Sequence, residues 1–296
     1  MMPLTEPIPA IMVEPLVRAA LLEDLGRAGD ITSAATIPAS ILLDGVIAAR
    51  ESGVVAGTDA AALAFRLLDP GISVAVEKPD GSRVSPGDIV IRLKGPARAV
   101  LSAERVALNL LCHLSGVATA TAALVEAARP FPVRIICTRK TTPGLRLLEK
   151  HAVRAGGGSN HRFGLDDAVL IKDNHVALAG GIRNAIVRSR HAAGPLVKIE
   201  VEVDTLAQLA EALESGVDAV LLDNMTPEQM REAVRMVNGR ALVEASGRIR
   251  LENVNAVAAT GVDLISAGWI THSAPALDLG LDVKSSGQFS SRGFLK

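Results

Sequence analysis

The second half of the sequence alternates short apolar runs with helical segments, and this alternation most limits the possible folds. After Pro132 the apolar runs occur at residues 133–137, 168–171, 197–203, 217–222, 240–245 and 262–267. Val220, Leu242 and Leu264 each stand 22 positions apart, the length of one strand, one helix and two short loops. Such a series needs right-handed crossovers between parallel strands. It favours a closed α/β barrel over a doubly wound sheet, which no Gly-x-Gly-x-x-Gly motif supports.

The helices of this repeat are expected at residues 182–192, 206–215, 227–237 and 251–259, where apolar positions recur at helical spacing. The first third of the chain has a different, α+β pattern. Helices are expected at residues 13–25 and 60–68, and short strands at 45–49, 53–56, 72–76 and 89–93. A long alanine- and leucine-rich helix follows from 97 to 129, and we expect it to break near Gly116. These patterns predict domains at residues 1–116 and 117–273, and a tail at 274–296 that packs back on the first domain.

Composition and charge exclude several classes of protein. The formal net charge of the 296 residues is −1, so no global basic field is present to bind nucleic acid. We find no apolar run expected to span a bilayer and no basic segment typical of a secretion signal near the start of the sequence. Cys112 and Cys137 stand in apolar surroundings without metal-ligand spacing, which predicts reduced thiols in a cytoplasmic protein.

Polar residues stand at the carboxyl end of every predicted barrel strand, where barrel enzymes have their active sites. Buried charges cost several kcal/mol unless they are paired, so a purely structural barrel has no use for this pattern. The sequence therefore predicts an enzyme. The polar groups are Thr138-Arg139-Lys140, Lys172 to His175, Glu200 and Glu202, Asp223-Asn224, Glu244 to Gly247, and Ser266 to Gly268.

The stretch from Arg139 to His175 holds seven Lys and Arg residues, three His and four acidic residues. Arg146, Lys150 and Arg154 are spaced four apart, as on the solvated face of a helix. The others, Arg139, Lys140, His161, Arg162 and Lys172, lie in loops or at strand ends. Convergence of such cations on one pocket indicates a ligand with more than one negative group.

Two glycine turns, Ser246-Gly247 and Ala267-Gly268, end neighbouring strands and favour a phosphate site, although glycines also simply end strands. Glu202 and Asp223 add two carboxylates. These could bind Mg²⁺, hold ribose hydroxyls or stabilise a cationic transition state, or they could be counter-ions for Lys140 and Lys172.

The motifs resemble those of the quinolinate phosphoribosyltransferase family. The resemblance rests on Thr138 to Arg146, on the run from Gly156 through His161-Arg162, and on Ile171 to His175, and it spans about residues 20 to 283. Further matches are Glu-Asp-Leu-Gly26 with Gly-Asp-Ile-Thr32, Ala-Glu-Arg105 to Asn109, and Thr-His-Ser-Ala-Pro-Ala-Leu-Asp278.

The resemblance implies transfer of phosphoribose from phosphoribosyl pyrophosphate to the nitrogen of quinolinate with decarboxylation, a Mg²⁺-dependent step of NAD synthesis. It also implies an N-terminal open-faced α/β sandwich, an incomplete seven-stranded TIM-like barrel, and a homodimer with the active site at the subunit interface.

The resemblance also assigns roles to residues. Arg139, His161, Arg162 and Lys172 match the quinolinate site, with Arg105 supplied by the second subunit. Lys140, Glu202 and Asp223 match the residues around the ribose and pyrophosphate. Glu202 and Asp223 also match the metal site. Ser246, Gly247, Gly268 and His272 match the 5′-phosphate site.

Two residues depart from the family pattern: Arg248 stands where a second glycine is expected, and Trp269 where a small residue is expected. The alternatives are a paralogous enzyme, nicotinate-specific or similar to the molybdate-operon pyrophosphorylase, and a non-catalytic nucleotide-binding barrel. The presence of His161-Arg162 and Lys172 favours quinolinate, and that of Lys140, Glu202 and Asp223 favours catalysis.

Overall fold

The computed structural model describes residues 6–283, and these form two compact units. The first unit takes in the chain up to Ala120, Pro143–Gly157 and the chain from Ser273 on, and the second comprises Thr121–Thr142 and Gly158–His272. The tail predicted at 274–296 contributes a strand to the first unit, and its residues 284–296 lie outside the described part of the chain.

The first unit is built on an antiparallel sheet of four strands in the order β12-β1-β5-β3. The strands are β1 (Leu42–Ala49), β3 (Ser73–Val76), β5 (Ile89–Pro96) and β12 (Leu279–Val283), and β2 (Gly53–Val54) pairs separately with β4 (Arg83–Val84). The central strand β1 pairs with both β5 and β12, with Gly45 opposite Leu93 and Val283. The strands predicted from the sequence are confirmed, but β12 joins from the far end of the chain.

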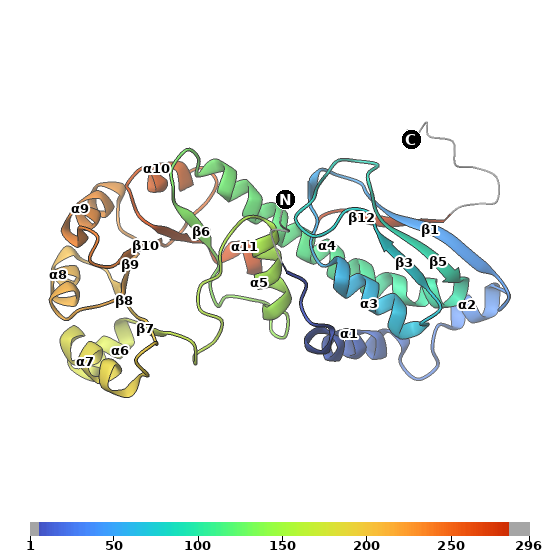
Figure 1. Ribbon diagram of the computed structural model, residues 1–296, viewed down its shortest axis with the longest axis horizontal. Helices are drawn as coiled ribbons and strands as arrows, with labels where there is room; N and C mark the ends of the chain where they lie inside the picture. Colours follow the sequence, from blue (N-terminus) through green and yellow to red (C-terminus); the bar gives the residue numbers. More distant parts are fainter. Residues whose placement is uncertain (1–5, 284–296) are drawn as a thin grey trace. The chain divides into compact units, whose positions relative to one another are not determined.

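Helices cover one face of this sheet, as an open-faced sandwich requires (Figure 1). They are α1 (Ala10–Leu25), α2 (Ile31–Thr36), α3 (Thr58–Leu68) and the first part of α4 (Ala97–Ala127). The core between sheet and helices contains Ile47, Ile91 and Phe65, all fully buried. Three buried alanines of α3, Ala60, Ala61 and Ala64, keep that helix surface small and allow close packing.

The helix α4 differs in two ways from the prediction. It runs unbroken for 31 residues, so the break expected near Gly116 is wrong. It is also long and apolar enough to cross a membrane, with a window of mean hydropathy 1.5, which the sequence analysis overlooked. The structure buries 67% of that window, which identifies α4 as a core helix.

The second unit is a curved sheet of six parallel strands in the order β6-β11-β10-β9-β8-β7. The strands are β6 (Arg134–Ile136), β7 (Val169–Ile171), β8 (Ile199–Val203), β9 (Ala219–Asp223), β10 (Leu242–Ser246) and β11 (Leu264–Ser266). All six predicted strands are confirmed. The seventh position is held by Ser159, which bridges Ile136 in parallel and exchanges hydrogen bonds with the backbone of Ile135 and Cys137.

Helices line the outer side of this sheet (Figure 1). They are α6 (Asp173–Ala179), α7 (Ile182–Ala192), α8 (Leu206–Glu214), α9 (Pro227–Val237) and α10 (Val254–Ala258). The short helix α11 (Trp269–His272) lies instead at the carboxyl ends of the strands. Thr205 and Thr226 start α8 and α9 with capping boxes, so these two helix starts are specified locally. The sheet has β6 and β7 at its edges, so the barrel is incomplete.

The helix α5 (Arg146–Ala155) lies in the first unit, although its sequence stands between two barrel strands. Buried pairs hold it there: Glu149 is 2.8 Å from Nε2 of His113, and Asp80 is 2.9 Å from Nε2 of His151. Lys150 is only 2% exposed, so the predicted solvated face is wrong for this residue, whereas Arg154 is exposed as expected. Tertiary packing overrides the spacing of charges here.

Gly116 is required by a close approach within the first unit. A Cβ atom at this position would lie 2.1 Å from the carbonyl oxygen of Pro275 and 3.0 Å from Cα of Ala276. Alanine favours a helix over glycine by about 1 kcal/mol, so propensity alone predicts that Gly116→Ala stabilises the protein. We expect the opposite, a loss of about 1–3 kcal/mol in the free energy of unfolding, because the backbone must move.

Urea denaturation of Gly116→Ala tests this. Gly194→Ala is the matched control, because the nearest atom to its new Cβ would be 4.0 Å away. Equal stability of Gly116→Ala and the wild type would contradict the packing argument.

Candidate active site

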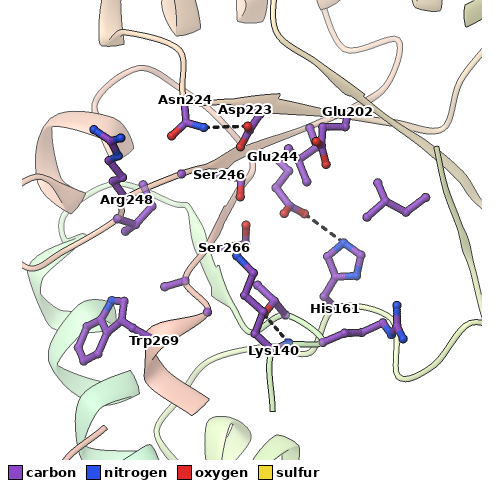
Figure 2. A pocket seen from close by; sticks show the side chains of 18 of the residues that line it. Lys140, His161, Glu202, Asp223, Asn224, Glu244, Ser246, Arg248, Ser266 and Trp269 are labelled. Atoms are coloured by element: carbon purple, nitrogen blue, oxygen red, sulfur yellow. Dashed lines mark hydrogen bonds and ion pairs between the residues drawn. The ribbon is translucent and has the colours of Figure 1, made fainter. Parts of the chain in front are cut away.

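A cavity of about 730 Å³ opens at the carboxyl ends of the barrel strands, within the second unit. Figure 2 shows side chains from separate strand ends directed toward this space. The cavity brings together eleven residues singled out from the sequence: Arg139, Lys140, His161, Arg162, Lys172, Glu202, Asp223, Ser246, Gly247, Gly268 and His272. Arg105, by contrast, is exposed on α4 in the first unit and is not among the lining residues.

Two arginines form one cationic side of the cavity. Burial lowers the pKa of the Arg162 guanidinium, and the nearby positive charge of Arg139 lowers it further. The Nη1 group of Arg162 donates to the carbonyl oxygen of Ala168 at 3.1 Å, while its buried Nε has no hydrogen-bond partner among the described residues. Two partly desolvated cations of like charge repel each other, so an anion bound between them would be strongly favoured.

Lys172 and Glu202 connect this side to the carboxylates. The Nζ atom of Lys172 lies 2.5 Å from Oε2 of Glu202, and the lysine side chain is still 48% exposed. On the next strand Asp223 accepts a hydrogen bond from the Asn224 side-chain amide at 2.7 Å. Glu202 is therefore a counter-ion of Lys172 in this state, and Asp223 leaves one carboxylate oxygen toward the cavity.

The glycine turns permit close approaches that side chains would prevent. Gly247 has φ 102°, and a Cβ on it would lie 2.3 Å from Oδ1 of Asn224. A Cβ on Gly268 would lie 3.0 Å from Cδ of Lys140 and 3.6 Å from Cδ2 of His272. The hydroxyl of Thr271 donates to the carbonyl oxygen of Lys140 at 2.8 Å and fixes the backbone of that loop.

Arg248 and Trp269 both line the cavity. Arg248 has φ 49°, in the left-handed region where glycine is favoured, so the backbone retains the shape that the expected glycine would take. The guanidinium of Arg250 lies 5.8 Å from the centre of the Trp269 ring, a cation–π distance. Nε1 of Trp269 is buried without a hydrogen-bond partner among the described residues. This end of the cavity thus has additional donors.

Glu200 and Glu244 were noted in the sequence only as polar strand residues, and no role was assigned to them. Both are buried, at 8% and 1% exposure. Oε2 of Glu200 lies 2.9 Å from Nε2 of His161, and Oε2 of Glu244 lies 3.5 Å from the same atom. Burial raises the pKa of Glu244 well above its ordinary value, and the negative charge of Glu200 adds to this effect. In the sequence each stands two residues before a predicted site residue, Glu202 or Ser246, and therefore on the same face of its strand. This spacing was the signal that could have identified them.

Two carboxylates of the cavity could hold a magnesium ion. Glu202 and Asp223 offer carboxylate oxygens to the same cavity, the donor type that Mg²⁺ prefers, and Mg²⁺ is commonly held by one or two carboxylates plus substrate phosphates. The donor set therefore fits Mg²⁺.

Comparison with known proteins identifies the family. Residues 30–115 match the family model for the N-terminal domain of quinolinate phosphoribosyl transferase, and residues 117–282 match the model for its C-terminal domain. A protein of Bacillus subtilis described as a probable carboxylating nicotinate-nucleotide pyrophosphorylase is 44% identical over 94% of this chain and 96% of its own length. The Mycobacterium leprae enzyme of that name is 46% identical over 90% of this chain and 95% of its own.

Solved structures give the same result. NadC from Streptococcus pyogenes superposes with a TM-score of 0.90 at 39% identity, over 95% of this chain and all of that one. A human nicotinic acid phosphoribosyltransferase, at 16% identity and a TM-score of 0.63, shares the fold alone. The fold and enzyme class expected from the motifs are confirmed, and the chain belongs to the quinolinate phosphoribosyl transferase family.

Proposed function

We propose that the barrel cavity holds quinolinate beside phosphoribosyl pyrophosphate and transfers phosphoribose to the quinolinate nitrogen. The 2-carboxylate leaves as CO₂, and the products are nicotinate mononucleotide and pyrophosphate. The observation that carries this proposal is the position of the Arg139–Arg162 pair opposite a carboxylate group and two glycine turns in one cavity. Only a ligand pair with several anionic groups satisfies all of these residues.

Arg139, Arg162 and Lys172 would hold the two carboxylates of quinolinate. Arginine binds a carboxylate with two parallel hydrogen bonds, and the buried Nε of Arg162 is a donor in need of a partner. Arg105 is exposed on α4, and we propose that the active site is completed by Arg105 of the partner subunit in a homodimer.

Ser246, Gly247, Gly268 and His272 would hold the 5′-phosphate of the second substrate. The glycines let backbone N–H groups approach phosphate oxygens closely. Lys140, which Gly268 allows to pass close to the turn, would reach the pyrophosphate or the ribosyl carbon. Arg248 and Trp269 lie at this end and add a cation and an N–H donor.

The chemistry requires stabilisation of positive charge at the ribosyl carbon as pyrophosphate departs. Glu202 and Asp223 would supply this electrostatically, because carboxylates fixed beside a developing charge need no reorganisation. The same residues would hold Mg²⁺ together with the substrate's phosphates, and the ion would neutralise the leaving pyrophosphate. When quinolinate arrives, its carboxylates compete for Lys172 and free Glu202 for this role.

Loss of CO₂ then needs little from the protein. The quaternary ring nitrogen stabilises the electron pair left at C2 by the departing CO₂, and C2 then takes a proton from water to give nicotinate mononucleotide. Holding the ring in place supplies most of the effect. We also propose that the enzyme acts in the cytoplasm, where the thiols of Cys112 and Cys137 are expected to stay reduced.

The assignment predicts that purified protein with Mg²⁺ and phosphoribosyl pyrophosphate consumes quinolinate and not nicotinate. The physical reason is that nicotinate lacks the second carboxylate, which leaves one of the cations unpaired. Release of CO₂ and formation of nicotinate mononucleotide, followed by chromatography, measure the reaction. Equal or faster use of nicotinate, or turnover of neither acid, would rule out the assignment.

Asp223→Asn is expected to lower kcat about 100-fold with less than a threefold change in the affinity for quinolinate. The substitution keeps the shape of the side chain and removes the charge that faces the ribosyl carbon. Steady-state rates and calorimetric titration with quinolinate separate the two quantities. Asp24→Asn, on the exposed side of α1, is the matched control. A variant with wild-type kcat would show that Asp223 has no part in the chemistry.

Gly247→Ala is expected to raise KM for phosphoribosyl pyrophosphate about tenfold or more. The new Cβ would collide with Asn224, and φ 102° is unfavourable for alanine, so the phosphate turn must shift. KM for quinolinate should stay within threefold of the wild type. Gly194→Ala again serves as control, and an equal rise in both KM values would contradict a defect confined to the phosphate turn.

A further inference from the structure

His161 was expected to contact quinolinate as one member of a cationic clamp, but its hydrogen bonds indicate a different role. Its Nδ1 accepts a hydrogen bond from the backbone N–H of Arg162 at 2.6 Å. A nitrogen that accepts carries no proton, so the proton of the neutral ring is on Nε2. Nε2 is in turn 2.9 Å from Oε2 of Glu200. Both ring nitrogens are thus engaged by the protein.

Two buried glutamates, Glu200 and Glu244, lie close to Nε2 of His161. Glu244 is 1% exposed, and its Oε2 has no hydrogen-bond partner among the described residues, although it lies 3.5 Å from Nε2 of His161. Burial and the adjacent charge of Glu200 raise the pKa of Glu244 well above its ordinary value, which favours the protonated carboxyl group. A protonated Glu244 can donate to Glu200, which also accepts from His161, so that one negative charge would be shared by three side chains.

A shared proton explains this cluster better than a metal ion. The three ligand atoms lie within 4.8 Å of one another and could in principle hold a cation. A tetrahedral zinc site would separate its ligand atoms by about 3.4 Å, whereas Nε2 and the Glu200 oxygen are at hydrogen-bond distance, 2.9 Å. Mg²⁺ prefers oxygen to imidazole nitrogen.

We propose that Glu200 and Glu244 are positioning residues that anchor the His161 ring, and that His161 in turn holds the backbone of Arg162 so that its guanidinium faces the anionic substrate. The inference rests on the proposed function for its substrate. His161 leaves the set of clamp residues and becomes the link between the strands β8 and β10 and the loop that carries Arg162. The guanidinium itself is held at a second point, by the carbonyl oxygen of Ala168.

The kinetic test uses Glu244→Gln and Glu244→Leu, which have similar volumes. The amide of Gln donates to Glu200 as the protonated carboxyl group does, so Glu244→Gln should keep KM for quinolinate within threefold of the wild type. Leu cannot donate, and Glu244→Leu should raise that KM about tenfold with less than a threefold change in kcat. Glu232→Gln, on the exposed face of α9, is the control carboxylate. Thermal unfolding of each variant confirms that it is folded.

The decisive comparison repeats Glu244→Leu in an Arg162→Ala background. If Glu244 acts through Arg162, KM for quinolinate should then change by less than twofold on removal of Glu244. A tenfold effect that persists without Arg162, or an effect confined to kcat, would overturn the proposal.

A second measurement does not depend on turnover. Nitrogen NMR of the His161 ring in the substrate-free wild type should show a protonated Nε2 and an unprotonated Nδ1, with the signals assigned by their loss in His161→Gln. A doubly protonated ring or a proton on Nδ1 would overturn the proposal even in an active enzyme. Conversely, failure of the wild type to use quinolinate would reject the proposed function while this signature still tests the anchoring of His161.

Discussion

The site depends on one constraint, the parallel alignment of six strands that all end at the same rim. Leu242 pairs with Ala219 and Ser246 with Asp223, and on the other side Glu244 pairs with Leu264. This register brings residues that are 20 to 23 positions apart in the sequence to the same height of the sheet. The antiparallel sheet of the first unit cannot do this, because its strand ends alternate in direction. Chemistry therefore concentrates in the second unit.

Charge balance determines how the cavity can work. The positive charge of Arg139 adds to burial in lowering the pKa of Arg162, which is a cost in the free protein. The ion pair with Glu202 offsets the positive charge of Lys172 in the free protein. Binding of a dicarboxylate would relieve the first cost and break the second interaction at once. In this way arrival of one substrate can prepare a carboxylate for the other, without any movement of the backbone.

The sequence was informative wherever local patterns decide the structure. The limits of α7 and α9 were predicted to the residue, because caps and periodicity are local signals. The burial of Lys150 was not predicted, because it depends on the packing of α5 in the first unit. That packing is held by His113 and Asp80, which pair with Glu149 and His151 of the helix. Ser159 was missed as a strand because a single bridge has no periodicity. Gly116 suggested a break, but its real partner, Pro275, is distant in sequence.

The functional residues follow the same division. Those predicted, such as Glu202, Asp223 and Ser246, end strands and have polar neighbours in the sequence. Glu200 and Glu244 lie one period earlier, where inward-facing residues of a barrel form the next layer below the rim. Leu221, which also lines the cavity, is apolar, as packing demands, whereas the two glutamates are buried acids. A buried acid can persist in such a layer only if a proton or a partner neutralises it, and Nε2 of His161 lies 3.5 Å from Oε2 of Glu244 as such a partner. In the proposed mechanism the rim binds the substrate, and Glu200 and Glu244 beneath it orient His161 and Arg162.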